Sequence, residues 1–267
     1  MLNFDVVLYH NHSEHQTFWI GCFAEGLKQH GIKPRVFGSV DKPHDADISV
    51  VWGVHNSHLM TGQTVVMERG YFGSRLKNIS CGWNGLNGRA DFKNNESPPD
   101  RWEQHGVDVL PWSTEGEYVL LMGQVQGDMA TKGVDLLNWY SETAQYIRTH
   151  TDRPVVFRPH PLSRQYHQVP GCFTRNVDLN EALAGAFACV TYNSNAGVDS
   201  VLAGVPTVVS DPGAMAWDVA SHEIDDLSYT PDRGQWLNDL AYCQWTEQEI
   251  RAGKAWEHLK YDINAGN

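Results

Sequence analysis

The sequence has few of the residues that mark several common classes of protein. Its five cysteines lie far apart and include no C-x-x-C pair, so we expect neither a disulfide framework nor a zinc knuckle. No apolar run approaches the roughly 18 residues of a membrane helix. The N-terminus also lacks the basic start and the cleavage site of a signal peptide. We therefore expect a soluble, cytoplasmic protein without membrane insertion.

Basic residues are also scarce. Lysine and arginine number 20 against 32 aspartates and glutamates, for a formal net charge of −12, whereas a non-specific nucleic-acid binder has a basic surface.

Among 13 histidines the only dense group is His10, His12 and His15, and no H-E-x-x-H pattern accompanies it. We therefore expect neither a bound metal nor a cofactor.

Two series of alternating strands and helices are present. Short β-branched runs at 48–52 and 64–67 are typical of strands buried on both faces of a parallel sheet. After a loop-rich stretch over 70–99, a second series begins with a strand at 118–122 and a helix at 134–150. We predict an α/β protein of two Rossmann-like domains, 1–113 and 114–267, facing each other across a cleft with C-terminal helices packing back. A single sheet with a helical end is the alternative.

A phosphate site is predicted where a buried strand meets the next helix. Ser194 and Asn195 follow that strand and small residues such as Gly197 open the helix, so backbone N–H groups and the helix dipole point at one place. Asp199 lies about one turn further on, where a carboxylate can accept hydrogen bonds from ribose hydroxyls. An ordinary capped helix with a packing glycine is the alternative.

Two more segments are expected at the same sheet edge. Arg158 and His160 follow the strand predicted at 154–157, and ligands of open α/β sheets bind at the carboxyl ends of strands. A glycine-containing turn follows the strand at 118–122. No G-x-G-x-x-G or G-x-x-x-x-G-K-[ST] pattern competes for the phosphate. The predicted donor-binding residues are Gly123, Gln124, Arg158, His160, Asn193, Ser194, Asn195, Gly197 and Asp199.

These segments resemble a known fold family. The His160-Pro161 pair, the Asn193-Ser194 pair with Asp199, and the run Gly204-Val205-Pro206 are similar to the C-terminal domain of GT-B glycosyltransferases, especially the capsular-polysaccharide, Kdo transferase-like family. The segments 68–72 and 82–88 are similar to an acidic-Gly-Tyr and Asn-Gly region of that family and of phage-encoded glycosyltransferases. The resemblance implies a GT-B fold and a His-Pro element with a Ser-capped helix that hold the nucleotide phosphate of the donor.

Transfer to a hydroxyl needs a base or carboxylate near the anomeric carbon. Glu68 is the first catalytic candidate because it ends a predicted strand, with a strand-end ion pair to Arg69 or Arg75 as the alternative. The second is His12 with Glu14 as its orienting partner, and the alternative is an ordinary polar loop. The residues predicted to bind the acceptor are Arg69, Tyr71, Trp83, Asn84 and Asn87, with Trp83 equally interpretable as a core residue.

The leading functional hypothesis is a metal-independent glycosyltransferase with a nucleotide-sugar co-substrate. Its acceptor is either a saccharide or a hydroxymethylated base of phage DNA, and the second would need a local basic patch. The residues that would form this patch are Arg75, Lys77, Arg89, Lys93 and Arg101. A nucleotide-sugar epimerase and a non-catalytic nucleotide- or sugar-phosphate-binding protein are the alternatives. The donor base, the sugar, the stereochemistry and the oligomeric state stay open.

Overall fold

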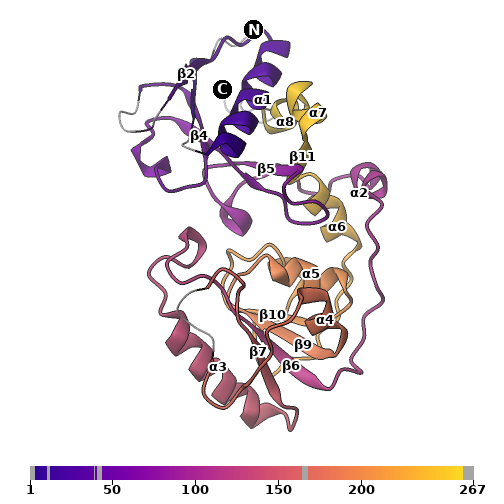
Figure 1. Cartoon of the computed structure of the whole chain (residues 1–267). Coiled ribbons are helices and arrows are strands. Elements are labelled where there is room, and N and C mark those ends of the chain that lie inside the picture. Colours follow the sequence, from indigo (N-terminus) through magenta and orange to yellow (C-terminus); the bar gives the residue numbers. More distant parts are fainter. Residues whose placement is uncertain (1–3, 11–12, 39, 41–43, 164–167, 261–267) are drawn as a thin grey trace. The chain divides into compact units, whose positions relative to one another are not determined.

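The chain folds into two compact units. Figure 1 shows the computed structural model, in which all residues are described except 1–3, 11–12, 39, 41–43, 164–167 and 261–267. Unit 1 comprises Met1–Gly106 and Leu237–Asn267, and unit 2 comprises Val107–Trp236. Each unit contains one sheet dominated by parallel strands with helices packed on it. The predicted fold class, an α/β protein with two Rossmann-like sheets, is confirmed.

The sheet of unit 1 is six-stranded, in the order β11-β5-β4-β3-β1-β2. Neighbouring pairs among β1 to β4 are parallel, whereas β5 runs antiparallel to both β4 and β11. Consecutive β1 residues alternate between the two faces, with Val6 and Leu8 in the main core and Val7 and Tyr9 in a smaller one. The strands are β1 (Val6–Tyr9), β2 (Arg35–Phe37), β3 (Ile48–Trp52), β4 (Gln63–Arg69), β5 (Asn78–Trp83) and β11 (Gln244–Thr246).

Helices from both ends of the chain share the main core of unit 1. The N-terminal α1 (Glu14–Gln29) packs against α7 (Glu247–Arg251) and α8 (Lys254–Leu259). The contact with α7 is close, because a Cβ on Gly26 would lie 2.1 Å from the carbonyl oxygen of Ile250. No described helix is long and apolar enough to cross a membrane. Unit 1 also contains α2 (Asp100–His105) and the 3₁₀ turns η1 (Ser57–Leu59) and η2 (Asn87–Arg89), and α6 (Gly234–Ala241) spans its second boundary.

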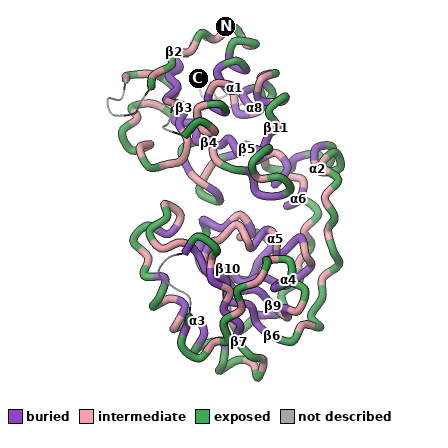
Figure 2. The backbone as a smooth tube through the Cα atoms, in the orientation of Figure 1, coloured by how far each residue is buried: buried purple, intermediate pink, exposed green. Residues whose placement is uncertain are grey.

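Unit 2 has a five-stranded, fully parallel sheet in the order β10-β9-β6-β7-β8. Figure 2 shows how buried residues follow its central strands. One face packs against α3 (Leu136–His150) and the other against α4 (Leu179–Ala184) and α5 (Ala196–Leu202). The strands are β6 (Tyr118–Met122), β7 (Val155–Arg158), β8 (Phe173–Thr174), β9 (Ala186–Thr191) and β10 (Thr207–Val209), with 3₁₀ turns η3 (Met129–Thr131) and η4 (Trp217–Val219).

The unit boundaries differ from the predicted domains 1–113 and 114–267. The chain leaves unit 1 after Gly106, and residues 237–267 belong to unit 1 rather than to the C-terminal domain. The physical reason is that β11 adds an edge strand to β5 and that Trp256 is buried in the core under α1. The C-terminal segment therefore completes the first sheet and its helical cover.

A buried ion pair joins the two chain segments of unit 1. Arg101, on α2, is 8% exposed and pairs with Glu249 on α7. Its Nε donates to the carbonyl oxygen of Ala241 at 3.1 Å and its Nη2 to that of Gln244 at 2.8 Å. The guanidinium also lies 4.0 Å from the ring centroid of Trp245. Arg101 is therefore a structural residue that connects α2 to β11 and α7.

Acidification is expected to weaken unit 1 through Glu249. Burial alone would raise the pKa of Glu249, but hydrogen bonds from Arg101 and Thr246 outweigh burial and hold that pKa below the ordinary value of 4.5. A carboxyl group with a depressed folded-state pKa stabilises the fold above its unfolded pKa, and this contribution disappears as the pH falls through the folded value. We expect the urea concentration at the unfolding midpoint of unit 1 to decrease when the pH is lowered below about 4.5. The fall should be shallower in Glu249→Gln, and an unchanged pH dependence in that variant would contradict the assignment.

Candidate functional site

The strand order of unit 2 determines where a ligand is expected. Chain connections run outward in opposite directions from β6 and β9, and ligands of such sheets bind beyond the carboxyl ends of the strands at this switch point. Gly123 and Gln124 follow β6, and Asn193 and Ser194 follow β9. His160 follows β7, which pairs with β6 on its other side. The fold thus brings three of the predicted donor-binding segments to one sheet edge.

Two of the predicted donor ligands are buried in a polar network. The Gln124 side chain donates through Nε2 to Asn193 Oδ1 at 2.8 Å, and Asn193 donates through Nδ2 to Asp211 Oδ1 at 3.0 Å. Gln124 and Asn193 are 7% and 1% exposed. Their side chains therefore connect the loops after β6, β9 and β10 to one another instead of facing a ligand. Sequence reasoning missed Asp211, whose signal is its position just after the β10 strand at the same edge.

His160 is arranged as a neutral hydrogen-bond donor. Its Nδ1 accepts a hydrogen bond from the backbone N–H of Leu162 at 3.1 Å, which places the proton of the neutral ring on Nε2. Burial and then the charge of Arg158 lower the pKa of His160, while Asp128 opposes them. Gly123 allows this loop to approach, because a Cβ there would lie 2.9 Å from the backbone nitrogen of His160. The Arg158 side chain is fixed through Nε, which donates to the carbonyl oxygen of Val177 at 2.9 Å.

The start of α5 carries the remaining predicted donor residues. Ser194 forms the turn, since its Oγ accepts from the backbone N–H of Ala196 at 3.2 Å, while Asn195 occupies the N-cap position with a helical φ of −62°. A Cβ on Gly197 would meet only ordinary contacts, the nearest at 3.5 Å. Asp199 is half-buried on this seven-residue helix. Donor binding by Asn195, Gly197 and Asp199 stays a prediction.

The sheet of unit 1 has its own switch point, between β1 and β3. Glu68 is half-buried at the end of the neighbouring strand β4, and its Oε1 accepts from the backbone N–H of Arg69 at 2.9 Å. Its Oε2 would lie 3.8 Å from a Cβ placed on Gly53, at the end of β3. Glu14 is exposed in the first turn of α1. The predicted base His12 lies outside the described residues.

His15 is a residue at this edge to which sequence reasoning gave no catalytic role. Its ring packs edge-on against Trp52 at a centroid distance of 5.5 Å, and within the described part of the chain its buried Nε2 has no hydrogen-bond partner. Burial and then the charge of Arg69 lower the pKa of His15. In the sequence, His15 belonged to the group of His10, His12 and His15, whose spacing could suggest only a metal site. Among the described residues, no group of three or more possible metal ligands is found.

Most of the predicted acceptor residues have structural roles instead. Trp83 is 3% exposed and donates through Nε1 to the carbonyl oxygen of Leu259 at 3.0 Å, so its ring is a core residue and cannot stack on a sugar. Tyr71 is fully buried with its ring against Phe92. Asn87 is also buried, with a φ of 53° in a 3₁₀ turn. Only Trp83 belongs to the buried strand β5, whereas Tyr71 and Asn87 are buried in the segments on either side of it. Acceptor binding by these three residues has no support in their burial.

Two of the predicted acceptor residues do lie at the surface. Asn84 has a φ of 58° and its Oδ1 accepts from the backbone N–H of Thr64 at 2.8 Å, so it also shapes the turn after β5. Arg69 is exposed at the end of β4, next to Glu68. Acceptor binding by Arg69 and Asn84 stays a prediction.

Solved structures share this arrangement of two α/β units. The β-Kdo 2,7 transferase of KpsC from Thermosulfurimonas dismutans superposes with a TM-score of 0.58 at 14% identity, over 98% of this chain and 100% of that one. The chain shares its fold with this transferase. The β-Kdo 2,4 transferase of KpsC from the same organism gives a TM-score of 0.59 at 13% identity, over 89% of each chain. No protein-family model and no curated protein sequence matches. At these identities the likeness concerns the fold.

Proposed function

We propose that this protein is a glycosyltransferase that moves a sugar from a nucleotide-sugar donor to a hydroxyl group of a saccharide. The observation that carries the proposal is the position of Arg158, His160 and Ser194 beside the β6/β9 switch point, in a fold shared with solved glycosyltransferases. Nucleotides bind at this place in doubly wound sheets. The proposed donor site therefore lies at the carboxyl edge of the unit 2 sheet.

Transfer creates negative charge on the phosphate that leaves the sugar, and groups fixed before the reaction stabilise that charge best. The Arg158 guanidinium supplies positive charge, and the Nε2–H of His160 can donate to a phosphate oxygen. Both side chains are held by hydrogen bonds to neighbouring backbone groups. We therefore propose a metal-independent reaction that needs no cofactor and takes place in the cytoplasm, where we expect the nucleotide sugar to be available.

The proposed catalytic carboxylate is Glu68 in unit 1. It ends a parallel strand at the carboxyl edge of the sheet, and Gly53 beside it leaves room for a substrate to approach. Arg69 follows it in the strand, and the charge of Arg69 acts in turn on His15. A carboxylate in this position can take the proton of the acceptor hydroxyl as a general base.

A saccharide acceptor is favoured over DNA by the basic residues of unit 1. A DNA site needs cations that are free to reach phosphates. Arg101 is buried in its pair with Glu249, and Lys93 pairs with Asp91 at 2.7 Å. Two of the five residues that would form the patch are therefore already paired with carboxylates of the protein. Turnover on hydroxymethylated duplex DNA, with none on oligosaccharides, would overturn the saccharide proposal.

Nucleotide binding provides the first test. We expect one member of a panel of UDP, CMP, GDP, ADP and dTDP to raise the melting temperature by several degrees, because a ligand at about 100 times its Kd stabilises the native state by roughly 2.7 kcal/mol. His160→Ala should abolish the shift. His150→Ala, which removes an exposed histidine at the end of α3, is the matched control and should keep it.

This panel, followed by product analysis with nucleotide sugars of the base that binds, separates the alternatives. If no nucleotide shifts the melting temperature, the donor site is refuted. If a nucleotide binds and the donor sugar is altered without any acceptor, the protein is an epimerase. If binding occurs with neither product, the protein is a non-catalytic binder.

A further inference from the structure

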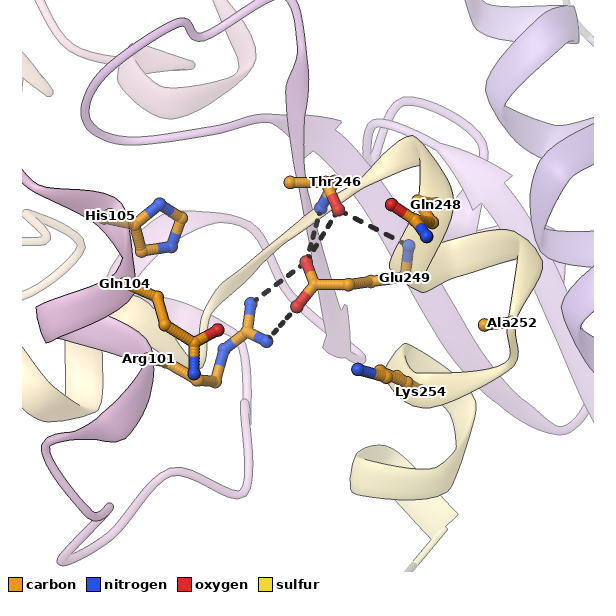
Figure 3. Close-up of a pocket in the computed structure, with 8 residues that line it drawn as sticks. All are labelled: Arg101, Gln104, His105, Thr246, Gln248, Glu249, Ala252 and Lys254. Carbon is orange, nitrogen blue, oxygen red and sulfur yellow. Dashed lines mark hydrogen bonds and ion pairs between the residues drawn. The ribbon is translucent and has the colours of Figure 1, made fainter.

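A pocket of about 350 Å³ lies entirely within unit 1, apart from the proposed transfer residues. It is formed by α2 on one side and by the segment from the end of β11 into α8 on the other. Figure 3 shows the residues that line it: Arg101, Gln104, His105, Thr246, Gln248, Glu249, Ala252 and Lys254. Its volume is near the lower end of the range for small-molecule sites.

Part of the pocket wall is rigid and carries no net charge. Arg101 and Glu249 neutralise each other. Glu249 is further fixed by a capping box, in which its Oε2 accepts from the backbone N–H of Thr246 at 2.9 Å and the Thr246 hydroxyl accepts from the Glu249 N–H. Both side chains of the pair are therefore already engaged. A ligand would meet a preformed wall and would have to be recognised by the other side chains.

Those other side chains bring one positive charge and several N–H donors. Lys254 is exposed at the start of α8, and its ammonium group points toward the Arg101–Glu249 pair (Figure 3). Among the residues that the structure describes, it has no carboxylate within 4.0 Å. Gln104 and Gln248 add side-chain amides at the rim. Burial and then the charge of Arg101 lower the pKa of His105, so its neutral ring adds one further N–H.

We propose that this pocket binds a small hydroxylated anion, such as a sugar that carries a phosphate or a carboxylate. Lys254 binds the charged group, because an ammonium that is not already paired with a carboxylate gains most from an oxyanion. Gln104 and Gln248 bind the hydroxyl groups, since amides both donate and accept. This site goes beyond the proposed function, because none of its residues belongs to the proposed donor or catalytic groups.

Calorimetric titration of the full chain tests this at constant ionic strength with glucose 6-phosphate, gluconate and glucose. We expect one or both anions to bind at least about tenfold more tightly than neutral glucose, and Lys254→Met to weaken that binding by about tenfold or more. Lys254→Arg should retain it. Lys33→Met is the matched control, because it removes the same charge from another exposed site in unit 1.

Three results would overturn the proposal. They are no binding of either anion up to about 10 mM, binding of glucose as tight as that of the anions, and binding that survives Lys254→Met unchanged. Lys254 is exposed, so these variants should fold, and the melting temperature of each checks that they do. The nucleotide response of unit 2 is measured in the same samples, so that failure of this site and failure of the donor site are distinguished.

Discussion

Replacing Arg101 with methionine is expected to lower the free energy of unfolding of unit 1 by about 3 to 5 kcal/mol. Methionine keeps an apolar stem of similar length but leaves the Glu249 carboxylate without its cation. The carbonyl oxygens of Ala241 and Gln244 also lose their donor, and the contact with the Trp245 ring disappears. Urea unfolding followed by tryptophan fluorescence measures the change, and Trp245 is one of the ten tryptophans that contribute to the signal.

An exposed ion pair in the same unit supplies the control. Arg35 pairs with Asp5 at 2.5 Å, with side chains that are 43% and 51% exposed. Such pairs contribute about 0 to 1 kcal/mol, so Arg35→Met should shift the urea midpoint little. Equal effects of Arg101→Met and Arg35→Met would show that the buried pair stabilises unit 1 no more than an exposed pair does.

Replacing Glu68 with glutamine is expected to slow sugar transfer by a factor of roughly 10² to 10⁴, the contribution typical of a general base. Glutamine has nearly the same shape and can still accept a hydrogen bond from the backbone N–H of Arg69. It cannot take a proton from the acceptor. Because Glu68 belongs to unit 1, nucleotide binding by unit 2 should stay the same, so the loss should fall on kcat rather than on donor affinity.

Glu142→Gln is the control for this experiment. Glu142 is an exposed carboxylate on α3 in unit 2, a helix that carries none of the proposed donor-binding or catalytic residues. Its loss should leave the rate unchanged. A loss of less than about tenfold for Glu68→Gln would refute the catalytic assignment. The strand-end carboxylate would then have a structural role, as its bond to the Arg69 backbone would allow.

Regular buried strands were predictable from the sequence, and irregular ones were not. The runs that form β3 and β6 match their predicted bounds, because β-branched and apolar residues are continuous there. The strand β5 lies in the stretch 70–99 that was predicted as a loop, because glycine, asparagine and serine accumulate there, Gly82 among them. That glycine is required by packing, because a Cβ there would lie 2.7 Å from the Phe92 ring. The short strand β11 lies in the C-terminal segment, which was predicted to be helical, and only its pairing with β5 identifies it as a strand.

The sequence predicted the edge of the candidate donor site better than the roles of its side chains. Strand ends placed His160 and Ser194 at the carboxyl edge of the unit 2 sheet, where the topology has them. The residue type alone does not show whether an amide side chain faces a ligand or holds loops together. Gln124 and Asn193 bond to each other, and Asn193 bonds to Asp211, and these contacts form only when three loops meet. The same limit applies to Trp83, since its core partner Trp256 lies far away in the sequence.

The division of unit 1 into two chain segments has a consequence for biosynthesis. Unit 2 is continuous in sequence, so all its strands have been synthesised before residue 237 is made, and domains generally fold as units during synthesis. The first segment of unit 1 emerges before unit 2, yet β5 has no β11 beside it and α1 has neither α7 nor α8 against it until residues 244–259 have been made. An uncovered strand edge invites wrong pairing. Unit 1 thus starts to form before unit 2 but is completed after it, so the open edge of β5 lacks its partner strand while unit 2 is being synthesised.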